Sequence, residues 1–109
     1  MASFSAGEVV LLVFPFTDGG TAKRRPALVL LDTGDSDVVV VRITSQTGTT
    51  AADVALDGWR RAGLLIPSTV RLHKVATLQK SLVERKLGRL DARDWSRVVV
   101  ALRGLCQTL

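Results

Sequence analysis

The sequence has little of several residue types on which whole classes of protein depend. One cysteine, Cys106, and one histidine, His73, stand among 109 residues, which excludes an intramolecular disulfide framework and any cysteine-rich zinc site. The longest uninterrupted apolar run is Val9–Phe14, far shorter than the ~18 residues that indicate a membrane span. The N-terminus lacks the basic region of a secretory signal. We therefore expect a cytoplasmic domain with no metal, no cofactor and no membrane contact.

The apolar content is high enough for a packed core. Apolar residues make up 47% of the chain, which excludes intrinsic disorder. No internal repeat, low-complexity tract or linker interrupts the sequence, so we expect residues 1–109 to form a single domain.

Positive charge is concentrated in the second half of the chain. Residues 1–58 hold 4 basic and 7 acidic side chains, net −3, whereas residues 59–109 hold 11 basic and 3 acidic side chains, net +8. A basic surface on a small domain is typical of proteins that bind nucleic acid. A net charge of +5 is also compatible with a merely soluble surface, so charge alone leaves both interpretations open.

Short β-prone runs, separated by turn residues, dominate the first two thirds of the sequence. We predict strands at Glu8–Phe14, Ala27–Leu31, Val38–Ile43, Asp53–Leu56, Leu64–Ile66 and Thr69–Leu72. The segment Lys74–Leu87 does not alternate cleanly and stays ambiguous. Because the apolar residues run continuously, the strands are expected to be covered on both faces or to curl into a small barrel.

The C-terminal segment carries the pattern of an amphipathic helix from Ala92 to about Cys106. Asp91 is a favourable N-cap, and Asp94 in the first turn faces the positive end of the helix dipole. One helical face is formed by Trp95, Val98, Val99, Leu102 and Cys106. We assign Trp95 to core or dimer contacts. The predicted fold is mainly β, with the C-terminal helix packed on a small barrel.

Composition permits metal-free RNA cleavage but does not indicate it. Such a reaction needs a base for the ribose 2′-OH, an acid for the departing 5′-oxygen and donors for the phosphorane charge. Arginines, hydroxyl groups and His73 could supply these functions. No phosphate-binding glycine loop and no metal-ligand spacing is present.

A series of short motifs resembles the MazF/PemK/Kid toxins of type II toxin–antitoxin systems, in order and over nearly the whole chain. The motifs are Gly7-Glu8-Val9-Val10, Arg25-Pro26-Ala27-Leu28-Val29-Leu30, Ile43-Thr44-Ser45-Gln46, Gly63-Leu64, Pro67-Ser68, Val70-Arg71, Val75-Ala76-Thr77-Leu78 and Leu87-Gly88-Arg89-Leu90. The resemblance implies a small SH3-like antiparallel β-barrel with a C-terminal α-helix, usually a homodimer. It also implies a metal-independent endoribonuclease that cuts single-stranded RNA at short sequences through 2′-OH attack. The products would be a 2′,3′-cyclic phosphate and a 5′-OH, and a cognate antitoxin would cover the RNA groove.

The resemblance also implies catalytic residues at matching positions. Arg25 stands at the family's arginine before proline, which stabilises or protonates the scissile phosphate. Thr44 matches the threonine after the third strand, which contacts the phosphate or ribose. Arg71 and His73 align with an Arg-x-Asp pair, with histidine in place of the acid, so the group that takes the 2′-OH proton stays open. Their spacing of two sets both side chains on one face of a strand.

Further residues are candidates for RNA contact. They are Lys23 and Arg24 at the end of the loop Thr17–Arg24, Ser45 and Gln46 after Thr44, and Trp59, Arg60 and Arg61, where an aromatic ring stands beside two cations. Asp18 is the acid of that loop, where family members often carry a glutamate that gates the site.

Two alternatives stay open beside the ribonuclease. A related fold serves non-catalytic toxins that poison gyrase through protein contacts, and a degenerate member could bind an antitoxin without activity. Fold does not separate these, because function depends on the site. The Arg25-Pro26 motif with Thr44 favours the ribonuclease.

Overall fold

The computed structural model describes residues 2–14 and 23–109, and they form one curved sheet with a helix at its side. The elements are β1 (Glu8–Phe14), β2 (Lys23–Leu31), β3 (Asp37–Thr44), β4 (Asp53–Ala55), β5 (Thr69–Gln79), the 3₁₀ turn η1 (Lys80–Leu82), β6 (Val83–Arg89) and α1 (Ala92–Cys106). The loop residue Asp18 and most of the loop Thr17–Arg24 lie outside the described residues.

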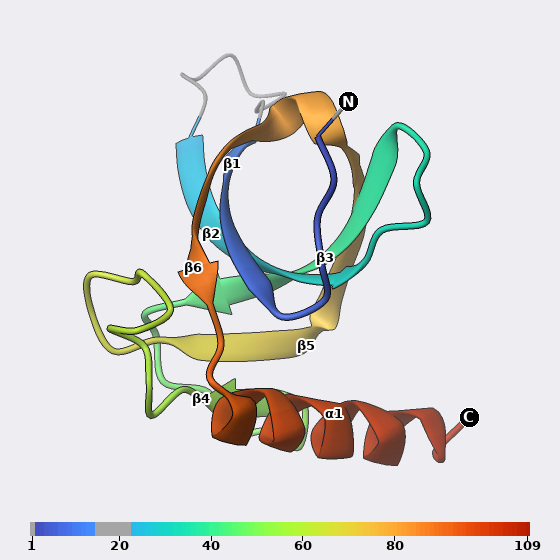
Figure 1. The fold of residues 1–109 in the computed structure, drawn as a ribbon. Coiled ribbons are helices and arrows are strands. Elements are labelled where there is room, and N and C mark those ends of the chain that lie inside the picture. The colour runs from blue at the N-terminus through green and yellow to red at the C-terminus, as the bar shows by residue number, and fades with distance from the viewer. Residues whose placement is uncertain (1, 15–22) are drawn as a thin grey trace.

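The sheet is antiparallel and curls into an open barrel. Its strand order is β4-β5-β3-β2-β1-β6, and every pairing between neighbours is antiparallel. Figure 1 shows β1, β2, β3 and β5 wrapping around a common axis, with α1 along the outside of the barrel next to β4 and β5. The predicted class, a mainly β barrel with a C-terminal helix, is confirmed.

Both faces of the curved sheet are buried, which explains the continuous apolar runs. On β1, Val9 belongs to the cluster beneath α1, whereas Val10 belongs to the cluster inside the curl. On β2, Leu28 and Val29 divide in the same way. Because successive side chains of a strand point to opposite faces, a strand covered on both sides needs apolar residues throughout.

The strand predictions agree to within one residue for β1, β3, β4 and the start of β5, whereas β2 begins at Lys23, four residues before the predicted Ala27. One prediction is wrong. The prediction of a strand at Leu64–Ile66 fails, because this segment is a bend after a series of turns. The amide groups of Gly63 and Leu64 donate to the carbonyl oxygens of Arg60 and Trp59, each at 3.1 Å. Local turns therefore satisfy these backbone groups. Leu64 packs into the core, whereas Leu65 and Ile66 are exposed and form a surface rim.

The ambiguous segment Lys74–Leu87 contains the end of β5, η1 and most of β6. Its alternation is broken by an irregularity in β5: Val75 lies opposite Val41, but Arg71 lies opposite the next residue of β3, Arg42. Three residues of β5, 72–74, therefore have no partner in the ladder between two consecutive residues of β3. Such a bulge bends the strand.

The helix spans Ala92–Cys106, as predicted, and packs against β4 and β5 (Figure 1). The Asp91 side chain accepts a hydrogen bond from the Asp94 amide at 2.8 Å, which confirms the N-cap. Val98 is fully buried, and Trp95 packs on the same core. Cys106 is exposed, so its place in the buried stripe was wrong. Leu105 packs there instead, because it follows Val98 by two turns and shares its face.

Candidate functional site

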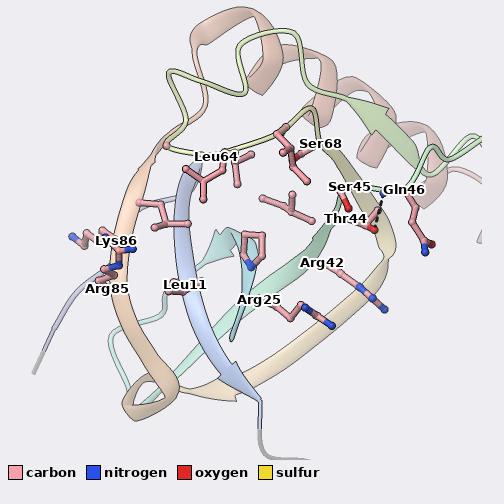
Figure 2. A pocket seen from close by; sticks show the side chains of 16 residues that line it. Leu11, Arg25, Arg42, Thr44, Ser45, Gln46, Leu64, Ser68, Arg85 and Lys86 are labelled. Carbon is pink, nitrogen blue, oxygen red and sulfur yellow. Dashed lines mark hydrogen bonds between the residues drawn. The ribbon is translucent and has the colours of Figure 1, made fainter. Parts of the chain in front are cut away.

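An open groove of about 660 Å³ lies where the ends of β2 and β3 face β6 and the loop before β5 (Figure 2). It is lined by Leu11, Arg25, Pro26, Arg42, Ile43, Thr44, Ser45, Gln46, Gly63, Leu64, Leu65, Ile66, Ser68, Arg85, Lys86 and Leu87. Four residues predicted from the sequence are among them: Arg25, Thr44, Ser45 and Gln46. Arg25 lies near the start of β2, Thr44 ends the neighbouring strand β3, and Ser45 and Gln46 follow β3 directly.

The antiparallel ladder of β2 and β3 brings Arg25 and Thr44 to the same end of the sheet. The last residue pair of that ladder is Ala27 with Arg42. Two residues beyond this pair stand Arg25 on β2, which begins at Lys23, and Thr44 at the end of β3; both line the groove. The Arg25 side chain is exposed, and the Thr44 hydroxyl accepts a hydrogen bond from the Gln46 amide at 3.2 Å. That bond fixes the turn out of β3 with the hydroxyl at the groove.

The groove is electropositive on two sides. Arg25 and Arg42 stand on one side, and Arg85 and Lys86 of β6 stand on the other (Figure 2). None of the described lining residues is a carboxylate. Lys86 is partly neutralised, since its Nζ lies 3.3 Å from the Glu8 carboxylate. An array of guanidinium donors without opposing acids suits a phosphate-bearing ligand.

Apolar side chains form the floor and the rim. Leu11, Pro26 and Ile43 lie at the floor, and Ile43 is only 2% exposed. At the rim, Leu65 is 93% exposed and Ile66 is 53% exposed. Apolar side chains this exposed at the edge of a groove are typical of a binding surface.

The rim is held in place from the first turn of α1. The carboxylate of Asp94 is fully buried and accepts hydrogen bonds from the Gly58 amide at 2.8 Å and the Asp57 amide at 3.3 Å. Farther along, Gly63 adopts φ +85°, and a Cβ there would stand 2.1 Å from the Leu87 carbonyl oxygen. Only glycine lets the loop approach β6 this closely.

Arg71 and His73 do not line the groove. The Nε atom of Arg71 lies 3.1 Å from the Asp53 carboxylate, whose side chain is 2% exposed. Hydrogen bonds from the amide and hydroxyl of Thr50, together with Arg71, hold the pKa of Asp53 below its ordinary value. His73 is exposed within the irregular part of β5. The structure thus engages Arg71 in an ion pair and leaves His73 exposed, with both residues outside the groove lining.

The other predicted RNA contacts also lie outside the groove lining. Arg24 pairs with Glu84 at 2.9 Å, and Lys23 is exposed next to it. Trp59 packs partly buried on the core beneath α1. The guanidinium of Arg60 stacks on the Trp59 ring at 4.9 Å, and Arg61 is exposed.

Sequence reasoning missed three cations of the groove: Arg42, Arg85 and Lys86. Arg42 had a recognisable signal, because it interrupts the apolar run Val38–Ile43 at a position where a charge would otherwise face the core. Arg85 and Lys86 had none, since they lie in the segment whose periodicity was ambiguous.

The chain matches a family model described as the PemK-like, MazF-like toxins of type II toxin–antitoxin systems, over residues 5–106. The chain belongs to this toxin family. No curated protein matches the sequence of this PemK/MazF-family toxin.

Solved structures share the fold of this PemK/MazF-family toxin. An endoribonuclease in complex with its cognate antitoxin, from a Mycobacterial species, is 20% identical with a TM-score of 0.77, and the alignment covers 98% of each chain. The MazE–MazF structure from Deinococcus radiodurans is 24% identical with a TM-score of 0.75, over 94% of each chain. The Mycobacterium tuberculosis toxin MazF-mt6 is 22% identical with a TM-score of 0.70, over 90% of this chain and 96% of that one. At these identities the likeness establishes the fold.

Two further features of the described chain bear on the site. No three His, Cys, Asp or Glu side chains in residues 2–14 and 23–109 stand close enough together to hold a metal ion. Within the same residues, no helix has the length and apolarity to cross a membrane.

Proposed function

We propose that the protein is an endoribonuclease toxin that cuts single-stranded RNA at short sequences without a metal ion. The observation that carries this proposal is the meeting of Arg25 and Thr44 in an open groove whose described lining contains four cations and no carboxylate. The match to the toxin family over residues 5–106 supports it. So does the fold, which it shares with a protein described as an endoribonuclease.

The groove accounts for the charge that develops in such a cleavage. The ribose 2′-OH loses its proton to a base and its oxygen attacks the adjacent phosphorus. The bond from phosphorus to the 5′-oxygen breaks and that oxygen takes up a proton, so the products are a 2′,3′-cyclic phosphate and a 5′-OH. Arg25 stabilises the phosphorane oxygens and protonates the departing 5′-oxygen. Thr44 holds the phosphate or the ribose through its hydroxyl. Arg71 and His73 stay predictions as auxiliary groups, acting from β5 beside the groove.

The proposed RNA contacts lie either in the groove beside Arg25 and Thr44 or on the surface outside the groove. Ser45 and Gln46 line the groove next to Thr44 and contact the neighbouring nucleotides. The exposed cations Lys23, Arg60 and Arg61 guide the strand by charge outside the groove. Binding therefore weakens as salt rises, because it depends on neutralised phosphates.

We further propose that a cognate antitoxin covers this groove and that the toxin works in the cytoplasm as a homodimer. The net charge of +5 and the basic groove favour an acidic partner segment. The exposed Leu65 and Ile66 at the rim offer that partner an apolar contact. A structural neighbour that was solved with its cognate antitoxin supports the pairing.

The first experiment incubates purified, antitoxin-free protein with a long single-stranded RNA in EDTA and maps the 5′ ends of the fragments. Discrete cuts that leave cyclic phosphates are expected, and they would also give the recognition sequence. Intact RNA after incubation with folded protein would overturn the proposal and favour the non-catalytic or inactive alternatives.

A matched pair of variants then tests the role of Arg25. Arg25→Ala should lower the cleavage rate by about 10²–10³-fold, the usual effect of removing one donor to a developing oxyanion, with unchanged thermal stability. Arg61→Ala removes the same charge from an exposed position outside the groove, and should weaken RNA binding while the chemical step persists. Equal, mild losses in both variants would refute the catalytic assignment of Arg25.

A further inference from the structure

Arg42 is one of three groove cations to which the family resemblance gives no role, and it stands on the same side of the groove as Arg25. We propose that Arg42 is a second phosphate-binding residue, which holds the RNA phosphate next to the one at Arg25. The inference rests on the proposed function, because it concerns the same groove and the same class of ligand.

The position of Arg42 in the sheet sets it beside Arg25. Arg42 lies opposite Ala27 in the ladder of β2 and β3, and Arg25 is two residues before Ala27 on β2. Two residues in this diagonal relation share one face of the sheet and stand about 7–8 Å apart, with their Cβ atoms somewhat closer. Both side chains line the groove on the same side (Figure 2). Two long guanidinium side chains at this separation can contact successive phosphates of one strand.

Arg71, which lies across from Arg42 in the sheet, provides a comparison, because it is an arginine with a structural role. Arg71 lies opposite Arg42 on the other side, in the ladder of β3 and β5. Its charge is matched by Asp53, which itself lies opposite Arg71 on β4. Asp53 is further anchored by the amide and hydroxyl of Thr50, at 2.9 and 2.8 Å. Arg71 is thus neutralised and held within the sheet.

Arg42 has no such match. It forms no ion pair or side-chain hydrogen bond with any residue in 2–14 and 23–109, and it is exposed. Like charges directly opposite each other on two strands are unfavourable. Asp53 reduces this repulsion between Arg42 and Arg71, because it neutralises Arg71. The guanidinium that stays uncompensated is the one that faces the groove. A planar fork of donors without a protein acceptor is suited to phosphate oxygens.

The test measures the salt dependence of RNA binding for Arg42→Gln, Arg42→Lys and the control Arg93→Gln. Arg93 is exposed on α1 and lies outside the groove lining, so its replacement removes one charge without a groove contact. The ligand is a single-stranded RNA that carries the mapped cleavage site, with 2′-O-methyl groups so that it is bound but not cut. Kd is measured by fluorescence anisotropy at KCl concentrations from about 0.05 to about 0.4 M, a range in which counterion release dominates the salt dependence of binding.

Loss of one phosphate contact on a single strand should reduce the slope of log K against log salt by about 0.7. At about 0.1 M KCl this corresponds to an affinity about five-fold lower. We expect this change for Arg42→Gln, a slope near that of the wild type for Arg42→Lys, and little change for Arg93→Gln. Equal slopes for Arg42→Gln and Arg93→Gln would overturn the inference.

The two proposals fail in distinguishable ways. If the wild type neither cuts nor binds RNA, the proposed function fails and the inference fails with it. If the wild type cuts RNA and Arg25→Ala abolishes cleavage, but Arg42→Gln binds like Arg93→Gln, the proposed function stands and Arg42 is not a phosphate ligand.

Discussion

Replacement of Asp94 by alanine should be among the most destabilising changes in the C-terminal half. Its carboxylate is fully buried at the point where α1 meets the loop that forms the groove rim. The carboxylate accepts hydrogen bonds from the backbone amides of Gly58 and Asp57 and lies 3.2 Å from the guanidinium of Arg97. The side chain therefore joins the helix, the loop and a surface cation.

The magnitude follows from what alanine would leave behind. The Gly58 amide, bound at 2.8 Å, would lose its acceptor, and a buried unsatisfied donor costs about 1–3 kcal/mol. The weaker bond to Asp57 and the ion pair to the half-exposed Arg97 add less. We expect a total loss of about 3 kcal/mol. With an unfolding entropy of about 2.1 cal/mol/K per residue, this lowers Tm by about 13 °C in a domain of this size.

Thermal and urea unfolding of three aspartate variants tests this reasoning. Asp91→Ala removes an N-cap and should cost about 1 kcal/mol. Asp57→Ala removes a side chain that is 64% exposed and 3.5 Å from Arg97, and should cost less than about 0.5 kcal/mol. If Asp94→Ala costs no more than Asp57→Ala, the buried carboxylate does not hold the rim and the argument is refuted.

Two further predictions concern the backbone and the acid range. Gly63→Ala should lower the stability by at least about 2 kcal/mol, because φ is +85° and the new Cβ would stand 2.1 Å from the Leu87 carbonyl oxygen. Gly104 lies in the helix with open space around it, so Gly104→Ala should raise the stability by up to about 1 kcal/mol. Equal effects of the two substitutions in urea unfolding would contradict this. The Lys80 ammonium at 2.8 Å, together with backbone amides, lowers the pKa of Asp32 from 3.8 to about 2. Since the folded pKa is the lower one, the stabilisation is complete above about pH 4 and is lost as the pH falls through 2. Asp32→Asn should flatten the pH dependence of the urea midpoint in this window, and curves parallel to the wild type would show that the pair does not contribute.

The helix and the first three strands were predictable because their signals are local. Asp91 as N-cap and the stripe around Val98 fix α1 through contacts within a few turns. The runs that became β1 and β3 are apolar at nearly every position, which a strand covered on both faces requires. The wrong strand at Leu64–Ile66 shows the limit of this reasoning. Three apolar residues have the composition of a strand, but the Leu64 amide donates to the preceding turn and its side chain enters the core, while Leu65 and Ile66 are exposed.

The candidate site was predictable only where a motif marked it. Arg25 and Thr44 were identified through the family resemblance, and the groove contains both. Arg42 was missed because a charge within a strand does not reveal which face of a curled sheet it occupies. Arg71 was expected to serve catalysis, and its ion pair with Asp53 became visible only when β4 and β5 were placed side by side.

The sequence by itself determined a β-rich chain ending in a helix and a toxin-family pattern of motifs, because composition, capping and periodicity act over short distances along the chain. The tertiary structure decided which charges meet. The pairing of β2 with β3 sets Arg25 beside Arg42, and the curl of the sheet brings Arg85 of β6 to the same groove. It also decided which arginine is neutralised, since ion pairing depends on distances of a few ångströms between residues far apart in sequence.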